Sequence, residues 1–344
     1  MTETSRAESF DLAIIGGGPA GLFGAFYAGL RGMRTLIIEA LPELGGQLAV
    51  LYPEKYIYDV PGFPKILARD LVKLLIEQAM QFEPTVRFEE QVTNLSPSGE
   101  KLLAVATTGG EYSTKAVLIA AGVGAFAPNK LDAPGVARLE GRGVYYFVKS
   151  KAELANRRLL IVGGGDSAVD WALNLQDTAR SITLIHRRDQ FRAHEHSVRD
   201  LHASRTDIRL FHELREVHGE EQVEAATIVD NRTGEETELP IDAVLLTLGF
   251  KADMGPIKNW GLSIEKRSLR VTSSMATSMP GVFAAGDIAG SDIKLDLIAV
   301  GFGQAAIAVN AAKTYIDPKA RLFPGHSSDM APGGGRQDKT ATTG

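Results

Sequence analysis

The chain of 344 residues contains no cysteine. This absence excludes a thiolate nucleophile, a redox-active disulfide, a cysteine-ligated zinc and a cysteine-held iron–sulfur cluster. Any redox chemistry must therefore be carried by a bound cofactor, and we expect no metal site.

An excess of positive charge and long apolar runs are also missing. The formal net charge is −5, with 37 basic and 42 acidic residues, so no attraction to nucleic acid or to an anionic membrane is expected. The uncharged apolar stretch between Lys115 and Lys130 contains two glycines and a proline. It is shorter than the roughly 20 apolar residues that span a bilayer. Because residues 1–9 lack the blocks of a signal peptide, we expect a cytoplasmic protein.

Length and composition predict a folded protein of two domains, because a domain typically has roughly 150 residues. Hydrophobic residues make up 44% and charged residues 23% of the chain, which is ordinary for a globular protein. The sequence after Met330 is rich in glycine and threonine and cannot bury a core. We therefore expect residues 331–344 to be disordered.

Two segments of the chain begin in the same way. Asp11 to Ile15 is an apolar β run that enters Gly16-Gly-Gly-Pro-Ala-Gly21, and Arg158 to Val162 enters Gly163-Gly-Gly-Asp-Ser-Ala168. A helical stretch and a second β run follow each turn, which is the βαβ unit of a dinucleotide fold. The sequence predicts an α/β fold with two Rossmann-like domains, each of three layers (ββα).

Two more apolar β runs, each ending in glycine, predict where the chain crosses between the domains. They end at Gly122 and Gly249. The first domain would then comprise residues 1–122 and 250–330, and the second, residues 123–249, would be inserted in it.

The first glycine turn has the spacing of a dinucleotide site. Gly16 permits the tight turn, Gly18 lets backbone N–H groups approach a pyrophosphate, and Gly21 lets helix and strand pack closely. Glu39 ends the next strand, eighteen positions after Gly21, where a carboxylate accepts ribose hydroxyls. It would repel a 2′-phosphate, which leaves FAD or NAD. An ordinary glycine turn is the alternative, but the flanking strand, the helix and Glu39 favour a nucleotide.

Two further features favour FAD. Gly46 and Gln47 supply a second flexible backbone and an amide that can hydrogen-bond a flavin. Asp287 follows a β run, and its carboxylate can bind ribityl hydroxyls. The helical stretch from about Leu295 to Tyr315 would direct its N-terminus at the pyrimidine end of the flavin. A helix cap or a turn is the common alternative for such an aspartate.

The second glycine turn is followed by basic residues where the first is followed by an acid. His186 stands in the acidic position, and Arg187 and Arg188 follow it, with Arg192 four positions further on. Guanidinium groups match a 2′-phosphate, so this site predicts NADPH; a solvated basic turn is the alternative. The predicted NADP-binding residues are Gly163, Gly165, Asp166, Ser167, Ala168, His186, Arg187, Arg188 and Arg192.

These motifs, in this order, resemble the two-domain flavoprotein reductases similar to thioredoxin reductase. The resemblance covers the chain up to Ser328. Thioredoxin reductases carry a Cys-x-x-Cys pair shortly before the second glycine turn, but residues 143–150 here read Gly-Val-Tyr-Tyr-Phe-Val-Lys-Ser. The thiol relay is therefore absent.

The sequence resembles more closely the thioredoxin-reductase-like ferredoxin–NADP reductases. Four strings carry this resemblance: Gly45 to Leu48, Tyr52 to Asp59, Ala121 to Phe126, and Pro318 to Arg321 with His326 to Ser328. It implies that Tyr52 stacks on one face of the flavin and His326 on the other, or on the flavin of a neighbouring subunit. A surface tyrosine and a solvated tail histidine are the alternatives. With the first glycine turn, the predicted FAD-binding residues are Gly16, Gly18, Pro19, Ala20, Gly21, Glu39, Gly46, Gln47, Tyr52, Val92, Phe126, Asp287 and Ser328.

The resemblance implies a ferredoxin–NADP reductase, with hydride transfer between NADPH and FAD and one-electron transfer between FAD and ferredoxin or a flavodoxin-type carrier. No catalytic side chain is obligatory, because the cofactor supplies the chemistry. It also implies a homodimer with one FAD per subunit. Ferredoxins are acidic, so a basic face is expected, although scattered solubilising charges are an equal alternative. Its candidates are Arg31, Arg34, Lys55, Lys65, Arg69 and Lys73.

Two other functions remain open on the same scaffold. One is an NADPH-dependent flavin oxidase or quinone reductase, which would pass electrons to oxygen or a quinone instead of ferredoxin. The other is a non-catalytic sensor that binds FAD and NADPH. A thioredoxin-type reductase is excluded by the absence of cysteine.

Overall fold

The computed structural model describes residues 9–122, 124–290 and 292–326. Contacts divide the chain into two compact units. The first holds the chain up to Val50, Tyr56–Ala125 and the chain from Asp253 onward, and the second holds Leu51–Lys55 and Phe126–Ala252. The second unit therefore interrupts the first in sequence, and each unit has a hydrophobic core of its own.

The first unit is built on a sheet with a parallel and an antiparallel part. Strand β8 belongs to both parts. One of its edges pairs with β1 from Ser113 to Ile119, and the other pairs with β7 up to Thr114 and with β21 from Val117 onward. The strand order is β5-β2-β1-β8-β7-β6, and β21 pairs with β8 on the same edge as β7. The strands are β1 (Ser9–Ile15), β2 (Thr35–Ile38), β5 (Thr85–Arg87), β6 (Val92–Gly99), β7 (Leu102–Thr107), β8 (Glu111–Ile119) and β21 (Val282–Ala284).

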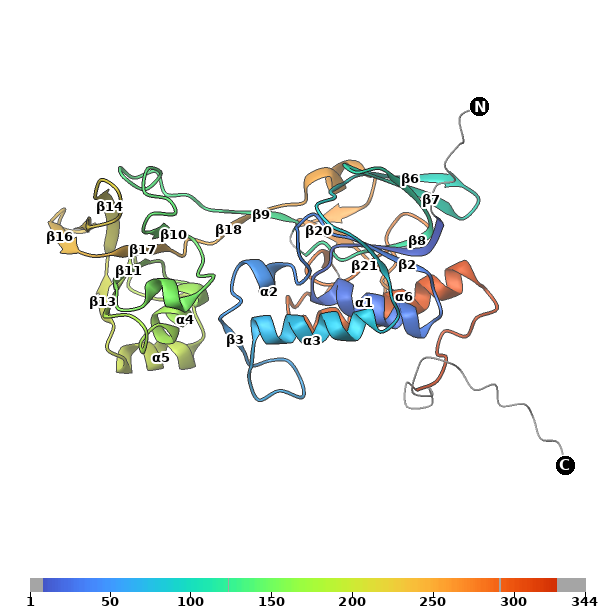
Figure 1. Ribbon diagram of the computed structural model, residues 1–344, viewed down its shortest axis with the longest axis horizontal. Coiled ribbons are helices and arrows are strands. Elements are labelled where there is room, and N and C mark those ends of the chain that lie inside the picture. Colours follow the sequence, from blue (N-terminus) through green and yellow to red (C-terminus); the bar gives the residue numbers. More distant parts are fainter. Residues whose placement is uncertain (1–8, 123, 291, 327–344) are drawn as a thin grey trace. The chain divides into compact units, whose positions relative to one another are not determined.

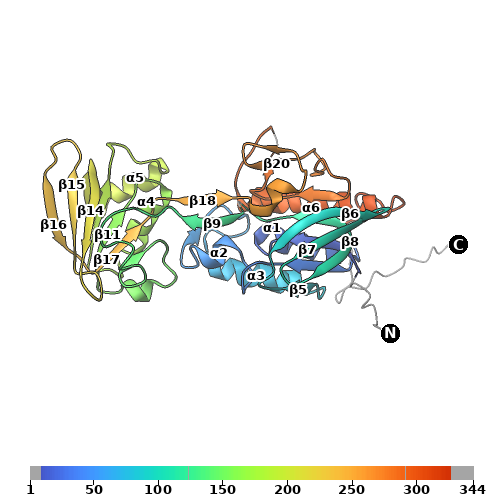
Figure 2. The ribbon, with the colours of Figure 1, turned by 90° about the horizontal axis from the view of Figure 1, so that it is seen from above.

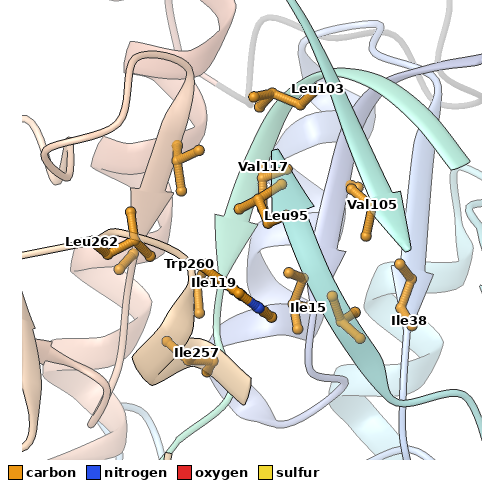
Figure 3. Close-up of a cluster of buried hydrophobic side chains, with 14 of the residues drawn as sticks. Ile15, Ile38, Leu95, Leu103, Val105, Val117, Ile119, Ile257, Trp260 and Leu262 are labelled. Carbon is orange, nitrogen blue, oxygen red and sulfur yellow. The ribbon is translucent and has the colours of Figure 1, made fainter. Parts of the chain in front are cut away.

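Three helices cover one face of this sheet: α1 (Pro19–Leu30), α3 (Ala68–Met80) and α6 (Ile298–Ile316) (Figure 1). Side chains alternate between the two faces of a strand. Ile14 therefore points toward α1, while Ile15 and Ile119 point to the opposite face. There they join the core that includes Leu95 of β6 and Trp260 (Figure 3). The three layers are helices, parallel strands and the β6–β7 ribbon.

The second unit repeats this arrangement. Its parallel sheet has the order β10-β17-β11-β12-β13, and a separate antiparallel sheet has the order β14-β15-β16. Leu159 and Ile161 of β11 pack toward helices α4 and α5, whereas Leu160 and Val162 pack toward β14–β16 (Figure 2). The bounds are β10 (Val144–Tyr145), β11 (Arg158–Val162), α4 (Asp166–Asn174), β12 (Ser181–His186), α5 (Glu195–Ala203), β13 (Asp207–Leu210), β14 (His212–His218), β15 (Ala225–Asp230), β16 (Glu236–Pro240) and β17 (Ala243–Leu246).

The predicted α/β fold with two three-layer Rossmann-like parts is confirmed. The remaining elements are short: α2 (Gln47–Val50), β3 (Tyr56–Ile57), β4 (Ile66–Leu67), β9 (Ala125–Pro128), β18 (Phe250–Asp253), β19 (Ile264–Glu265), β20 (Ser268–Arg270), β22 (Ala289–Gly290) and the 3₁₀ helices at Lys151–Leu154 and Gly255–Asn259. None of the helices in the described ranges is long and apolar enough to cross a membrane.

Candidate nucleotide-binding sites

The first glycine turn joins the end of β1 to the start of α1. Gly16 has φ +105°, and a Cβ at this residue would lie 2.5 Å from the carbonyl oxygen of Ala120. A Cβ at Gly21 would lie 1.9 Å from the carbonyl oxygen of Gly16. Both contacts are with backbone atoms, which cannot yield as a flexible side chain does. These two glycines are therefore required by the turn itself.

Gly18 meets a different requirement. A Cβ there would find only the Cα of Gly46, at 3.9 Å, so the protein's own packing does not demand glycine. Gly18 is the N-cap of α1, and no side chain caps the helix. The first N–H groups of a helix lack partners within it and favour an anion. The backbones of Gly18 and Gly46 thus lie close together at an uncapped helix start, which fits a pyrophosphate.

Glu39 connects the turn to the end of β2. Its Oε2 accepts a hydrogen bond of 2.7 Å from the N–H of Gly17, and its Oε1 accepts one of 2.9 Å from Leu41. Glu39 is only 6% exposed, and this burial raises the pKa of its carboxyl group, although the backbone N–H groups oppose the shift. Further donors such as ribose hydroxyls would stabilise the buried carboxylate.

Gln47 lies at the meeting point of three chain segments. The N–H of Gly45 donates to the carbonyl of Gly17 at 2.8 Å, which places the start of α2 against the glycine turn. A Cβ at Gly122, just beyond β8, would lie 3.1 Å from Nε2 of Gln47. The Gln47 amide therefore lies at the carboxyl end of the parallel strands, where ligands bind in such sheets.

The turn that precedes Asp287 lies against the start of α1, because a Cβ at Gly286 would meet the Cβ of Ala20 at 3.2 Å. Burial raises the pKa of the Asp287 carboxyl group, and the charge of Asp296 raises it further. Gln304 of α6, which sequence reasoning missed, fixes this turn by accepting the N–H of Gly286 at 2.9 Å. No motif signals Gln304. Helix α6 has no side-chain cap at its N-terminus.

The other predicted FAD residues are placed less directly. Val92 is the first residue of β6 and is buried in the core of the first unit. Tyr52 packs against the core of the second unit, and the exposed ring of His326 contacts Phe323 edge-on, with 5.2 Å between centroids. Their stacking on a flavin stays a prediction. Phe126 lies in β9, and Ser328 and residues 331–344 lie outside the described residues.

The sequence offered Arg31 as a candidate for an exposed basic face, but the structure places it in the interior of the first unit. It is only 9% exposed. Its guanidinium group donates to the side chain of Asn310 and to the carbonyls of Leu322 and Arg321, at 3.0 and 2.6 Å for the two carbonyls. Arg31 therefore ties the end of α1 to α6 and to the segment that follows it.

The second glycine turn has the same construction. A Cβ at Gly163 would lie 2.3 Å from Oγ1 of Thr247, and one at Gly164 would lie 2.1 Å from the ring of His186. Gly165 is the N-cap of α4 and has an open position, with only the carbonyl oxygen of Arg192 at 3.9 Å. Helix α4 has no side-chain cap, and its residue Ala168 is fully buried. This turn also fits a pyrophosphate.

The basic residues after β12 surround this turn. The ring of His186 stacks on Phe191, with 5.4 Å between centroids, and its Nε2 donates to the carbonyl of Gln190 at 3.1 Å. Burial, reinforced by the nearby arginines, lowers the pKa of His186, so its ring is neutral at pH 7. The positive charge of this region therefore resides on Arg187, Arg188 and Arg192, which are all exposed.

With both turns described, the whole chain can be compared with known proteins. A family model described as pyridine nucleotide-disulphide oxidoreductase matches residues 10–312. The chain belongs to the pyridine nucleotide-disulphide oxidoreductase family. This membership confirms the resemblance to this class of reductases that was inferred from the motifs.

Within the pyridine nucleotide-disulphide oxidoreductases, the chain is similar to proteins named ferredoxin–NADP reductase. The one from Thermus thermophilus is 54% identical over 94% of this chain and 98% of its own length. The one from Sulfurisphaera tokodaii is 53% identical over 93% and 98%. Among solved structures, the thioredoxin reductase of Lactococcus lactis matches with a TM-score of 0.77 and 28% identity, covering 89% of this chain and 99% of that protein.

Proposed function

We propose that this protein is a ferredoxin–NADP reductase. The observation that carries the proposal is the identity of about half of the residues, over nearly the whole chain, to proteins with that name. The absence of cysteine separates the chain from disulfide reductases of the same family, because no thiol can accept electrons. Electrons must then leave for an acceptor outside the chain.

The first unit would bind FAD, one per subunit, and the second NADPH. The Gly16–Gly21 turn would hold the FAD pyrophosphate, Glu39 the ribose and Asp287 the ribityl hydroxyls. The chemistry that FAD supplies when bound is the exchange of a hydride with NADPH and of single electrons with ferredoxin or a flavodoxin-type carrier. The chain's own residues bind and orient the cofactors, and none needs to act as an acid or a base.

Selection between the two nucleotides would follow from charge. Glu39, a buried carboxylate beside the first turn, rejects a 2′-phosphate. The exposed Arg187, Arg188 and Arg192 beside the second turn attract one. The homodimer implied by the sequence resemblance is part of the same proposal.

Anaerobic reduction of the purified flavoprotein tests this function. NADPH should bleach the flavin absorbance, and ferredoxin should then restore it faster than oxygen or a quinone does. If oxygen or a quinone restored it as fast as ferredoxin, the protein would be an oxidase or a quinone reductase. If NADPH left the absorbance unchanged, a non-catalytic sensor would be the better account.

A further inference from the structure

The segment from Arg187 to His194, called the arginine loop below, connects β12 to α5. It carries the three guanidinium groups of the second site. Their side chains are exposed, and a long side chain that is not preorganised loses more conformational entropy on binding than one that is. The backbone of the loop must therefore be fixed if the three groups are to converge on one phosphate.

Asn231 holds the first end of the loop from a different sheet. Its Nδ2 donates to the carbonyl of Arg187 at 2.9 Å and to Oε1 of Glu213 at 3.2 Å. Its own N–H donates to the carbonyl of Phe211 at 2.8 Å. Asn231 follows directly after β15, so the β14–β16 sheet fixes the amide that holds Arg187.

Asp166 holds the other end of the loop. It is the first residue of α4, and its Oδ1 accepts the N–H of His194 at 3.0 Å. Beside it, the N–H of Arg192 donates to the carbonyl of Gly164 at 2.6 Å. The loop is thus tied to the glycine turn at His194, the residue directly before α5.

The charge of Asp166 is otherwise hard to explain. A carboxylate at the first residue of a phosphate-binding helix repels the phosphates that this helix end should attract. Its hydrogen bond from the N–H of His194 indicates that Asp166 holds the loop in place and does not contact the ligand. Asn231 likewise fixes the loop with a neutral amide, which adds no negative charge to compete for the guanidinium groups.

We propose that Asn231 and Asp166 are positioning residues that hold the two ends of the arginine loop and thereby set the preference for NADPH over NADH. This inference rests on the proposed function and assigns that preference to two residues outside the set of arginines. Loss of either contact loosens the arginines. It therefore weakens the binding of ligands with a 2′-phosphate and leaves the binding of ligands without one almost unchanged.

Calorimetric titration of the FAD-loaded protein tests this, with adenosine 2′,5′-bisphosphate and adenosine 5′-monophosphate as probes. Asn231→Ala should lower the affinity for the bisphosphate about three- to tenfold, as expected for one lost hydrogen bond. The affinity for the monophosphate should change less than about twofold. Thr233→Ala is the matched control, because its hydroxyl accepts the N–H of Glu235 within the same hairpin. It should change neither affinity.

Two variants of Asp166 separate positioning from charge. Asp166→Asn keeps an oxygen acceptor for His194 but removes the charge, and it should bind the bisphosphate at least as tightly as the wild type. Asp166→Ala loses the acceptor and should bind it about three- to tenfold more weakly. In steady-state assays Asn231→Ala should show a raised KM for NADPH with an unchanged kcat, and Asp166→Ala should also show a raised KM for NADPH.

The inference fails if Asn231→Ala lowers the affinity for both probes equally or for neither. It also fails if Asp166→Asn and Asp166→Ala have the same affinity for the bisphosphate. Should Asn231→Ala not fold, the Asp166 pair decides alone. A wild type that cannot bind the bisphosphate would refute the proposed NADPH site. A wild type that binds it, with unchanged variants, would refute only the positioning role.

Discussion

Replacing Gly21 by alanine should destabilise the first unit and release its cofactor. Gly21 is the third residue of α1, and its Cβ would lie 1.9 Å from the carbonyl oxygen of Gly16. That carbonyl cannot swing away easily, because the N–H of Gly17, in the same peptide unit, donates to Oε2 of Glu39 at 2.7 Å. Either the helix or the turn must therefore move, and both belong to the proposed pyrophosphate site.

The magnitude follows from two opposing effects. Alanine in a helix is favoured over glycine by about 1 kcal/mol. Overpacking against fixed atoms costs about 1 to 3 kcal/mol, and more where backbone must move. We expect a net loss of about 2 kcal/mol for Gly21→Ala. Gly303→Ala is the matched control, because Gly303 is an exposed residue of α6 with nothing within 4 Å of its Cβ position. It should gain about 0.5 to 1 kcal/mol.

Tryptophan fluorescence can report on the first unit alone. The chain has two tryptophans; Trp260 is buried in the core of the first unit and Trp171 in that of the second. Urea unfolding in a Trp171→Phe background, together with the FAD content of the purified variants, gives the comparison. If Gly21→Ala were as stable as Gly303→Ala and retained its FAD, the reasoning about the turn would be refuted.

Three further predictions concern other contacts. Arg31→Met should raise hydrogen exchange in residues 318–326 at least about tenfold, because charge-assisted bonds to this segment are lost; unchanged exchange by mass spectrometry would contradict the role of Arg31. The Arg158 guanidinium holds the pKa of Asp242 below its ordinary value of 3.8, so the stability contributed by this carboxylate is present above pH 3.8 and lost as the pH falls through the lowered pKa. The deficit of Asp242→Asn in urea unfolding should therefore vanish in acid, and a deficit independent of pH would argue against the ion pair. Arg188→Leu should raise the KM for NADPH at least about tenfold and leave that for NADH unchanged; an equal rise in both KM values would remove Arg188 from the 2′-phosphate site.

The sequence predicted the parts of both sites that depend on local backbone chemistry. The glycine turns, the strand before each and the helix after each could be inferred because glycine spacing and apolar periodicity are local signals. Leu159 to Val162 show the same principle in the core, since their alternation sends neighbouring side chains into different layers.

Contacts between distant segments could not be predicted in this way. Arg31 looked like a solvent-exposed cation, and only the fold brings it to carbonyls some 290 positions away. Gln304 and Asn231 belong to no motif, because their partners are backbone groups that any residue could supply. Asp166 was predicted beside the phosphates, but its hydrogen bond to the N–H of His194 follows from the path of the arginine loop.

The central claim is that electrons pass from NADPH through the flavin to ferredoxin. Its most direct test is steady-state nucleotide oxidation by the purified flavoprotein, with ferredoxin as acceptor and a haem protein as reporter, measured for NADPH and NADH. The account predicts that haem reduction requires ferredoxin and that kcat/KM is higher for NADPH than for NADH. Haem reduction that is equally fast without ferredoxin, or equal kcat/KM for the two nucleotides, would contradict it.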